Sequence, residues 1–507
     1  MAKVCHLCGL PVDVLLHIAP FLDCADILCL TETSKAFHDI LLPESVKRAG
    51  TSPIYRAKIH AFHRFLRIGD DSGRSRVCWL RSFAYCPKLQ RNAQSLPLRH
   101  LDAGTAEGAH LTLDILRHAS NITSLSLHSL VGFDPGQLRL VLTNMVGLTY
   151  IDFRRVPRQG VHDDTLLNTT AALRTVSLSM VSPDYAPIRN PATDASPMLR
   201  TCATIQVLSL QYVRLLARSG PFPAVRSLYL RSYHLPEGVS TLVTLFPAVR
   251  ELCLNDHYLA ETLQGPLTGH ETPWSEVQSL RERNRAWQLT HGSWHALDHL
   301  SVDKADTGYA LGLMCRVDRL DVRYVDGTGP GIFATLLEDV RPHRFGFRGY
   351  HFSPYFKCQT LANLGPLTPL ATAPSVTHLV CWTVDDALVY LELDAIVANI
   401  GQHLRSGTVT HICLHIRSTV RPESSGLQLH APQLAADMYK SSLRKTVDAI
   451  VALVQSIRCV LVEFGGLGMK GGMVGNDGLW KDLNDMESRL VMKEEGLQDR
   501  SGGYPRS

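Results

Sequence analysis

Residues 249–255 read Val-Arg-Glu-Leu-Cys-Leu-Asn, and this short phrase decides the fold. Its apolar residues Val249, Leu252 and Leu254 are separated by two positions and then by one. Side chains alternate between the two faces of a strand, so Leu252 and Leu254 share a face. The phrase therefore predicts a short strand with one buried face.

The same phrase returns along most of the chain. The copies are Leu98-Leu101-Ala103, Ile122-Leu125-Leu127, Leu148-Ile151-Phe153, Leu173-Val176-Leu178, Ile205-Leu208-Leu210, Val225-Leu228-Leu230, Leu297-Leu300-Val302, Val317-Leu320-Val322, Phe345-Phe347, Val376-Leu379-Cys381, Val409-Ile412-Leu414 and Ile457-Val460-Val462, with Leu80-Phe83-Tyr85 as an earlier, weaker copy. If the two longest intervals each hide one copy, the average spacing resembles that of leucine-rich repeats, about 20–29 residues.

Segments with apolar residues at helical spacing lie between these phrases. They include Leu111-Ile115-Leu116, Leu138-Val141-Leu142, Leu242-Leu245, Ile332-Leu336-Leu337, Ile396-Val397-Ile400-Leu404 and Val447-Ile450-Val451-Val454. One strand and one helix cannot bury their apolar faces alone, but stacked neighbours can. We expect an irregular leucine-rich-repeat-like α/β solenoid, with a parallel sheet on the concave side and helices on the convex side. The alternative is a mixed α/β domain whose strands merely resemble repeats.

Residues 10–41 form the second informative stretch, and they resemble the F-box family. Leu10, Pro11, Ile18, Leu22, Asp23 and Asp26 match the family pattern outright; Asp13 and Ile27 stand where the family prefers Glu and Leu; and Thr33, Ser34 and Phe37 occupy the Val, Cys and Trp positions of its closing signature. Three short helices of this length keep apolar surface exposed until a partner covers it. The alternative is an ordinary helical cap on a larger domain.

The F-box resemblance implies docking onto a Skp-type adaptor and, through it, a cullin scaffold. The adaptor-binding residues would be Leu10, Pro11, Val14, Leu15, Ile18, Phe21, Leu22, Ile27, Leu28 and Phe37. An F-box followed by leucine-rich-like repeats resembles the divergent F-box proteins of fungi. This implies a non-catalytic substrate receptor of a ubiquitin ligase, which tethers a protein substrate. The alternative is a ligase-independent scaffold for protein–protein interaction.

The fold class that we expect is α+β or α/β, with four consecutive regions. An F-box spans residues 9–50, a basic helical linker 51–92, the solenoid 93–465 and a flexible tail 466–507. Residues that alternate with the buried leucines should face the concave side and bind substrate, and arginine and aromatic residues are the usual anchors of protein interfaces. These candidates are Tyr229, Arg231, Arg319, Arg323, Arg348, Trp382, His411 and His415. The arginines would suit an acidic or phosphorylated segment.

Composition excludes several other classes. The chain has 507 residues, 45% of them hydrophobic, and a net charge of +4, which is too small to indicate nucleic acid. No run of 18 apolar residues exists, so we expect no membrane span. The 13 cysteines have no framework spacing, which is typical of reduced thiols in the cytoplasm or nucleus.

Two motifs have the spacing of a cofactor site or a metal site but lack the surrounding residues that such a site needs. Gly466, Gly468 and Gly471 have dinucleotide-fingerprint spacing, but too little chain follows for the required helix and second strand. Cys5-x-x-Cys8 has zinc-like spacing, yet the next cysteines lie within the F-box helices. The 23 histidines show no pair spaced as metal ligands. We therefore expect no cofactor and no metal.

Overall fold

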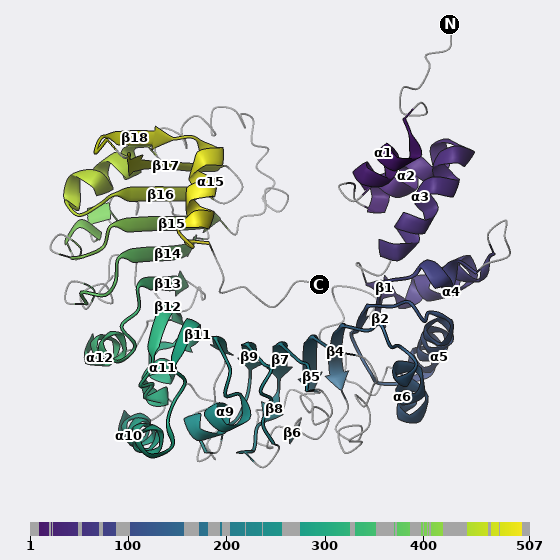
Figure 1. Cartoon of the computed structure of the whole chain (residues 1–507), viewed down its shortest axis with the longest axis horizontal. Coiled ribbons are helices and arrows are strands. Elements are labelled where there is room, and N and C mark those ends of the chain that lie inside the picture. Colours follow the sequence, from purple (N-terminus) through teal and green to yellow (C-terminus); the bar gives the residue numbers. More distant parts are fainter. Residues whose placement is uncertain are drawn as a thin grey trace, which may run out of the picture.

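A computed structural model defines the fold (Figure 1). It describes residues 10–498 except for these stretches: 20–21, 23, 49–52, 70–74, 88–101, 157–171, 181–192, 195–202, 218–219, 236, 256–273, 325–329, 351–369, 371–372, 386–396, 399, 403, 405–406, 419–443, 465–467 and 476.

The chain is a mixed α/β protein built on one large open sheet. Sixteen described strands form this sheet in chain order, and neighbours are parallel from β1 to β16. The strands are β1(Ile54–Tyr55), β2(Ser82–Cys86), β3(Ser124–Leu127), β4(Tyr150–Val156), β5(Thr175–Met180), β7(Val207–Gln211), β9(Ser227–Arg231), β10(Glu251–Asn255), β11(Ala296–Lys304), β12(Arg316–Tyr324), β13(Arg344–Tyr350), β14(His378–Asp385), β15(His411–Ser418), β16(Cys459–Phe464), β17(Gly468–Val474) and β18(Trp480–Leu483). A separate pair contains β6(Thr193–Asp194) and β8(Val213–Arg214).

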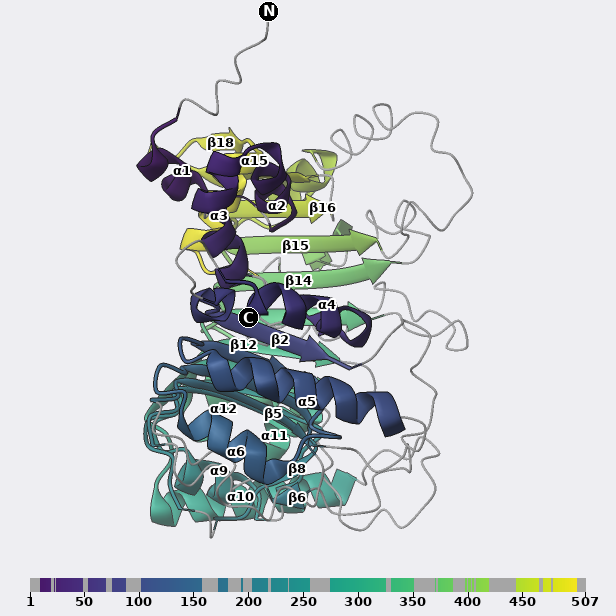
Figure 2. The ribbon, with the colours of Figure 1, turned by 90° about the vertical axis from the view of Figure 1, so that its right-hand side faces the viewer.

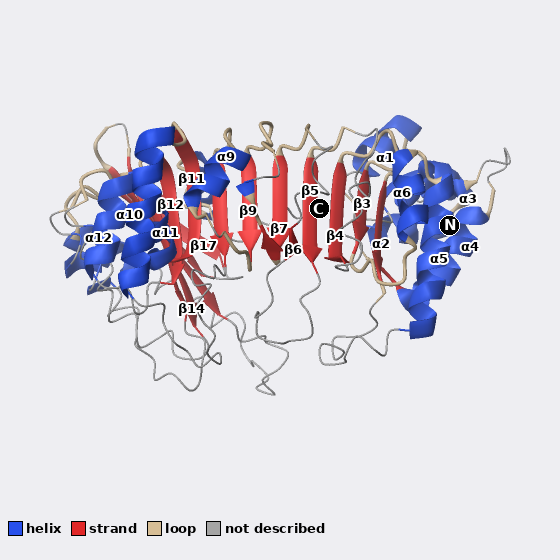
Figure 3. Ribbon diagram, turned by 90° about the horizontal axis from the view of Figure 1, so that it is seen from below, coloured by secondary structure: helices blue, strands red, loops and turns tan. Residues whose placement is uncertain are grey.

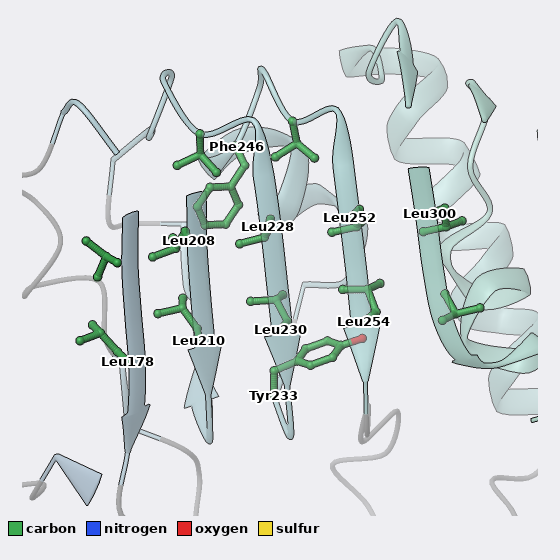
Figure 4. Close-up of a cluster of buried hydrophobic side chains, with 14 of the residues drawn as sticks. Leu178, Leu208, Leu210, Leu228, Leu230, Tyr233, Phe246, Leu252, Leu254 and Leu300 are labelled. Atoms are coloured by element: carbon green, nitrogen blue, oxygen red, sulfur yellow. The ribbon is translucent and has the colours of Figure 1, made fainter. Parts of the chain in front are cut away.

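The repeated apolar phrase sets the register of the sheet. Leu208, Leu228, Leu252 and Leu300 stand side by side in β7, β9, β10 and β11. All four are fully buried, and Figure 4 shows them in a row, with Leu210, Leu230 and Leu254 below the first three. Alternating side chains thus give these strands one apolar face and one more polar face.

Helices cover the outer side of the curved sheet, and the inner side faces the centre of the arc (Figures 1 and 2). They include α4(Arg56–Arg67), α5(Asp102–His118), α6(Pro135–Thr143), α9(Val239–Leu245), α10(Trp274–His291), α11(Ala305–Leu311) and α12(Pro330–Val340). Figure 3, seen from below, shows the strands side by side with the helices outside them. None of the helices described is long and apolar enough to cross a membrane.

Two expectations about the repeats are wrong. Ala103 lies in α5, so the proposed strand at 98–103 is wrong there, and Leu98 and Leu101 lie outside the described residues. The weaker copy Leu80-Phe83-Tyr85 is instead the first full strand, β2, with Phe83 beside Leu125 of β3. The two longest intervals add no further strand to the main sheet among the described residues, because β10 pairs directly with β11 and β15 with β16.

Three helices precede the sheet: α1(Val12–Ile18), α2(Cys24–Thr33) and α3(Lys35–Arg48). They share a small core of their own, made of Leu15, Ala19, Ile27, Phe37 and Leu41. The second half of α3 is different, because its buried residues Leu42 and Val46 belong to the main core of the sheet. The last helix of this module is therefore fixed to the rest of the molecule.

Strands and a helix form over Gly468–Val474, Trp480–Leu483 and Asp485–Glu494, which corrects the expectation of a flexible tail over 466–507 for these residues. There, β17 and β18 extend the sheet as antiparallel strands, and α15(Asp485–Glu494) follows on the inner side of the arc (Figure 1). Asn484 and Glu487 form a reciprocal capping box at the start of α15. The sheet thus exceeds the expected range 93–465 at both ends, since β1 and β2 arise from the region 51–92. Gly468 and Gly471 lie in β17, which leads into β18 rather than into a helix.

Candidate protein-binding surfaces

Four apolar side chains of α1 are exposed to solvent. Val12, Val14, Leu16 and Ile18 are 52%, 36%, 41% and 37% exposed, while Leu15 packs in the small core. Residues four apart share a helix face, so Val14 and Ile18 lie on one flank of Leu15 and Val12 and Leu16 on the other. Apolar surface left in water costs about 25 cal/mol per Å². Each flank is therefore suited to contact with another protein.

The residues expected to bind the adaptor are partly exposed and partly buried in the structure. Pro11, Val14 and Ile18 are exposed, and Leu10 and Leu22 are partly buried against the small core. Leu15, Ile27 and Phe37 are buried within that core, so the expectation that they contact a partner is wrong for this structure. Phe21 lies outside the described residues, and the side chain of Leu28 is not described. Val12 and Leu16 are exposed as well, although the F-box pattern gives them no adaptor-binding position.

The C-terminal segment covers part of the concave face, and this changes the expected substrate site. Trp382, Cys413, Leu461 and Leu497 belong to a second core on the inner side of the sheet, against which Val491 of α15 packs. The ring of Trp382 stacks on His415 at 5.7 Å between centroids. Trp382 and His415 are each 2% exposed, so both are structural residues rather than contacts for cargo.

Three hydrogen-bonding contacts hold the residues that follow α15. Arg344 Nε donates to the Glu495 carbonyl (3.0 Å), Arg319 Nη1 donates to the Gly496 carbonyl (2.7 Å), and His415 Nε2 lies 3.4 Å from the Leu497 carbonyl. The side chain of Arg319 is buried, which corrects its expected role in binding substrate. These contacts join β12, β13 and β15 to one short stretch of chain.

Buried ion pairs support this cover. Asp321 accepts hydrogen bonds from Arg319 Nε (3.1 Å) and contacts His299 Nε2 (2.8 Å). Burial raises the pKa of the Asp321 carboxyl, but Arg319 and His299 outweigh burial and lower the pKa to about 2. The carboxylate therefore stays ionised, and the network holds its charge in place.

His415 has the opposite shift. Burial lowers the pKa of its imidazole, but the Cys413 sulfur and the Glu463 carboxylate outweigh burial and raise the pKa to about 10. Nδ1 of His415 lies 2.6 Å from Glu463 Oε2. His415 is therefore positively charged at neutral pH and forms a buried ion pair beneath the C-terminal segment.

His378 of β14 and His411 of β15 lie directly beside each other in the sheet. The rings of His378 and His411 are stacked, and Nε2 of His378 lies 3.2 Å from Glu495 Oε2. Burial and the neighbouring His411 lower the pKa of His378 to about 4, although the bond to Glu495 raises it. Burial also lowers the pKa of His411. His411 is only partly buried, and it lies at the edge of the covered area rather than on open surface.

The other half of the concave face, over β3–β9, lies away from α15 in Figure 1. Its floor consists of small hydroxyl side chains, among them Ser124, Thr175, Ser177, Ser179 and Ser227. Arg154 and Arg231 are exposed there, and Tyr229 lies between the strands with its hydroxyl 3.4 Å from Glu251 Oε2. The sequence hypothesis included Tyr229 and Arg231 but missed Arg154, which pairs with buried Asp152 (2.9 Å).

The remaining expected substrate residues do not join this open area. Arg323 of β12 is partly buried and pairs with Asp303 of β11 (3.2 Å). The side chain of Arg348 is not described. Of the eight residues expected to bind substrate, Tyr229 and Arg231 are therefore the two that the structure places together on open surface.

Comparisons with known proteins find no relative. No family model matches the chain, and a search of curated proteins finds no match either.

Proposed function

We propose that this chain is the substrate-recognition subunit of a Skp-cullin-F-box ubiquitin ligase, working in the cytoplasm or nucleus. The observation that carries the proposal is the exposure of four apolar side chains of α1, Val14 and Ile18 on one flank of the helix and Val12 and Leu16 on the other. Exposed apolar side chains gathered on one short helix are typical of a site that a partner protein covers. The resemblance of residues 10–41 to the F-box favours a Skp-type adaptor as that partner.

The rest of the chain is suited to hold a protein substrate. Its ordered parallel strands and outer helices support an irregular leucine-rich-repeat-like solenoid, whose concave face is rigid and extended. Arg154, Tyr229 and Arg231 would anchor cargo above the hydroxyl-lined floor of β3–β9, and the arginines favour an acidic or phosphorylated segment. The chain would perform no bond chemistry, and would raise the concentration of substrate lysines near a conjugating enzyme.

A ligase-independent scaffold is the second candidate. It is favoured by the burial of Leu42 and Val46 of α3 in the main core, because a helix so placed also caps the first strands of the sheet. In that case α1–α3 would complete the fold, and the apolar face of α1 would contact a different protein.

Co-precipitation with the Skp-type adaptor and cullin tests the proposal. Val14→Glu/Ile18→Glu places two charges on exposed positions, so the small core stays intact while the docking surface is lost. We expect adaptor capture to fall at least about tenfold, since charging an interface anchor costs about 2 kcal/mol or more. Leu140→Glu, on the exposed side of α6, is the matched control because Leu140 is 57% exposed. No capture by the folded wild-type chain, or equal capture by the double variant, would reject the adaptor and favour the scaffold.

A further inference from the structure

Two neighbouring strands begin with the same three residues. Val376-Thr377-His378 leads into β14 and Val409-Thr410-His411 into β15, and parallel pairing places His378 directly beside His411. The two imidazole planes are 5° apart, with centroids separated by 4.2 Å. Both rings therefore extend in the same direction from the concave face of the sheet.

The preceding threonines hold each ring through its Nδ1. Nδ1 of His378 lies 2.7 Å from Thr377 Oγ1, and Nδ1 of His411 lies 2.8 Å from Thr410 Oγ1. Each hydroxyl has other acceptors in reach: Thr410 the Thr377 carbonyl (3.3 Å), and Thr377 the His343 carbonyl (3.5 Å) and ring (3.1 Å). A hydroxyl that donates to one of these accepts a proton from the imidazole. In that tautomer Nδ1 carries the proton and Nε2 presents a lone pair.

Glu495 brings a carboxylate to these nitrogens. It is the C-cap of α15, and Gly496 adopts a left-handed conformation (φ 65°) directly after it. The Leu497 N–H donates to the Met492 carbonyl and the Gly496 N–H to the Lys493 carbonyl, a pattern typical of a helix that ends at glycine. The backbone thus fixes Glu495 independently of its side chain.

Nε2 of His378 faces the carboxylate of Glu495. Nε2 of His378 and Oε2 of Glu495 are 3.2 Å apart. The carboxylate either accepts a hydrogen bond from Nε2–H of the neutral ring or shares a metal cation with the Nε2 lone pair. Neutral imidazole, held through its other nitrogen, is the form of histidine that binds metal.

We propose that His378 Nε2, His411 Nε2 and the Glu495 carboxylate bind one divalent transition-metal ion, with zinc as the preferred ion. Their ligand atoms all lie within 4.8 Å of one another. Tetrahedral ligands at about 2.1 Å from zinc are about 3.4 Å apart, so the ligand atoms must approach by about 1 Å. The stacked rings must also tilt, because their Nε2 lone pairs lie in parallel ring planes and have to converge on the ion. Two histidines and one carboxylate are a zinc donor set that leaves a fourth position for water. His411 and Glu495 are partly exposed, which gives the ion a route from solvent.

The ion would act as a clasp between distant parts of the chain. It joins β14 and β15 to the C-terminal segment that covers this half of the concave face. Uncovering that half would then require loss of the metal as well as of the backbone contacts. The inference rests on this geometry alone and holds whether or not the chain docks onto a ligase.

Zinc binding by the full-length chain tests the clasp. The experiment uses metal-free protein with Cys5→Ser/Cys8→Ser, which removes the zinc-like cysteine pair, and titrates Zn²⁺ against a chromophoric chelator. We expect one equivalent bound with Kd below about 10 μM, and at least about tenfold weaker binding in His378→Gln, His411→Gln and Glu495→Gln. His295→Gln is the matched control, because His295 is an exposed histidine remote from these three residues in the sequence.

A second readout reports on the clasp itself. Zinc should slow tryptic cleavage after Arg489 and Lys493 of α15, and it should not do so in Glu495→Gln. Glu495 is 40% exposed, so this variant retains the fold even if a histidine variant does not. The clasp is rejected if the chain binds no zinc in this range, if His378→Gln/His411→Gln retains the same equivalent, or if zinc gives no protection. Nε2–H of neutral His378 would then donate a hydrogen bond to Glu495.

Discussion

Arg319 donates a hydrogen bond from Nη1 to the backbone carbonyl of Gly496, 2.7 Å away in space and 177 positions along the chain. The same guanidinium contacts Asp321 through Nε at 3.1 Å, and its Cζ lies 5.8 Å from the centre of the Trp382 ring. One side chain thus links β12, β14 and the C-terminal segment. The arginine that sequence reasoning assigned to cargo instead stabilises the chain's own cover.

Arg319→Met should strongly destabilise the protein. The substitution leaves the Asp321 carboxylate buried with His299 as its remaining ionic partner, and loss of one member of a buried ion pair costs about 3–5 kcal/mol. Urea denaturation monitored by tryptophan fluorescence measures the free energy of unfolding. Arg250→Met is the matched control: Arg250 is 49% exposed and 4.0 Å from Asp298, and such surface pairs contribute about 0–1 kcal/mol. Equal losses in both variants would contradict the assignment.

Gly346→Ala should lower the stability of the fold, because the residues around Gly346 are closely packed. A methyl group on Gly346 would overlap Asp321 Oδ1 and would lie 2.7 Å from Cζ3 of Trp382. Overpacking of this kind costs about 1–3 kcal/mol. Gly331→Ala in α12 is the control, since nothing lies within 4 Å of its added methyl and alanine favours helix. Thermal unfolding should show a lower Tm for the first variant and an unchanged or higher Tm for the second; the reverse order would be inconsistent with this packing.

The His415–Glu463 pair should make stability depend on pH. The pKa of His415 is raised to about 10 in the folded state, above about 6.5 in an unfolded chain. Its contribution is therefore complete below about pH 6.5 and is lost as the pH rises towards 10. Glu463→Gln removes the carboxylate, so the difference in unfolding free energy between wild type and variant should shrink between pH 6.5 and 10. A constant difference across this range would show that the pair carries no such linkage.

The sequence predicts the strands well where apolar residues alternate, as in β10 and β12, because burial of one strand face leaves a pattern that needs no further information. It gives Leu98-Leu101-Ala103 more weight than the copy Leu80-Phe83-Tyr85, although Ala103 lies in a helix and the latter copy is β2. It misses β17, where three glycines and two methionines among seven residues carry no strand pattern, and α15, where half of the residues are charged.

The candidate sites are likewise only partly predictable from the sequence. The apolar composition of α1 is plain from the sequence, but which of its residues turn inward depends on packing with α2 and α3. His378 and His411 occupy the same position of two repeat phrases, each within Val-Thr-His, but their contact with each other and with Glu495 depends on strand register and on the docking of α15. The burial of Arg319, Trp382 and His415 depends on a segment that local sequence patterns describe as tail.

The ordering of the main sheet also has a consequence for how the molecule is assembled. Each strand finds its partner in the strand that precedes it along the chain, so the sheet can grow in the direction of synthesis with short loop closures. The contacts of Arg319 with Gly496 and of Arg344 with Glu495 are exceptions, because they join positions 177 and 151 residues apart. Docking of α15 thus closes some of the longest loops of the chain, and its amide protons should be among the first to exchange with solvent in the native state.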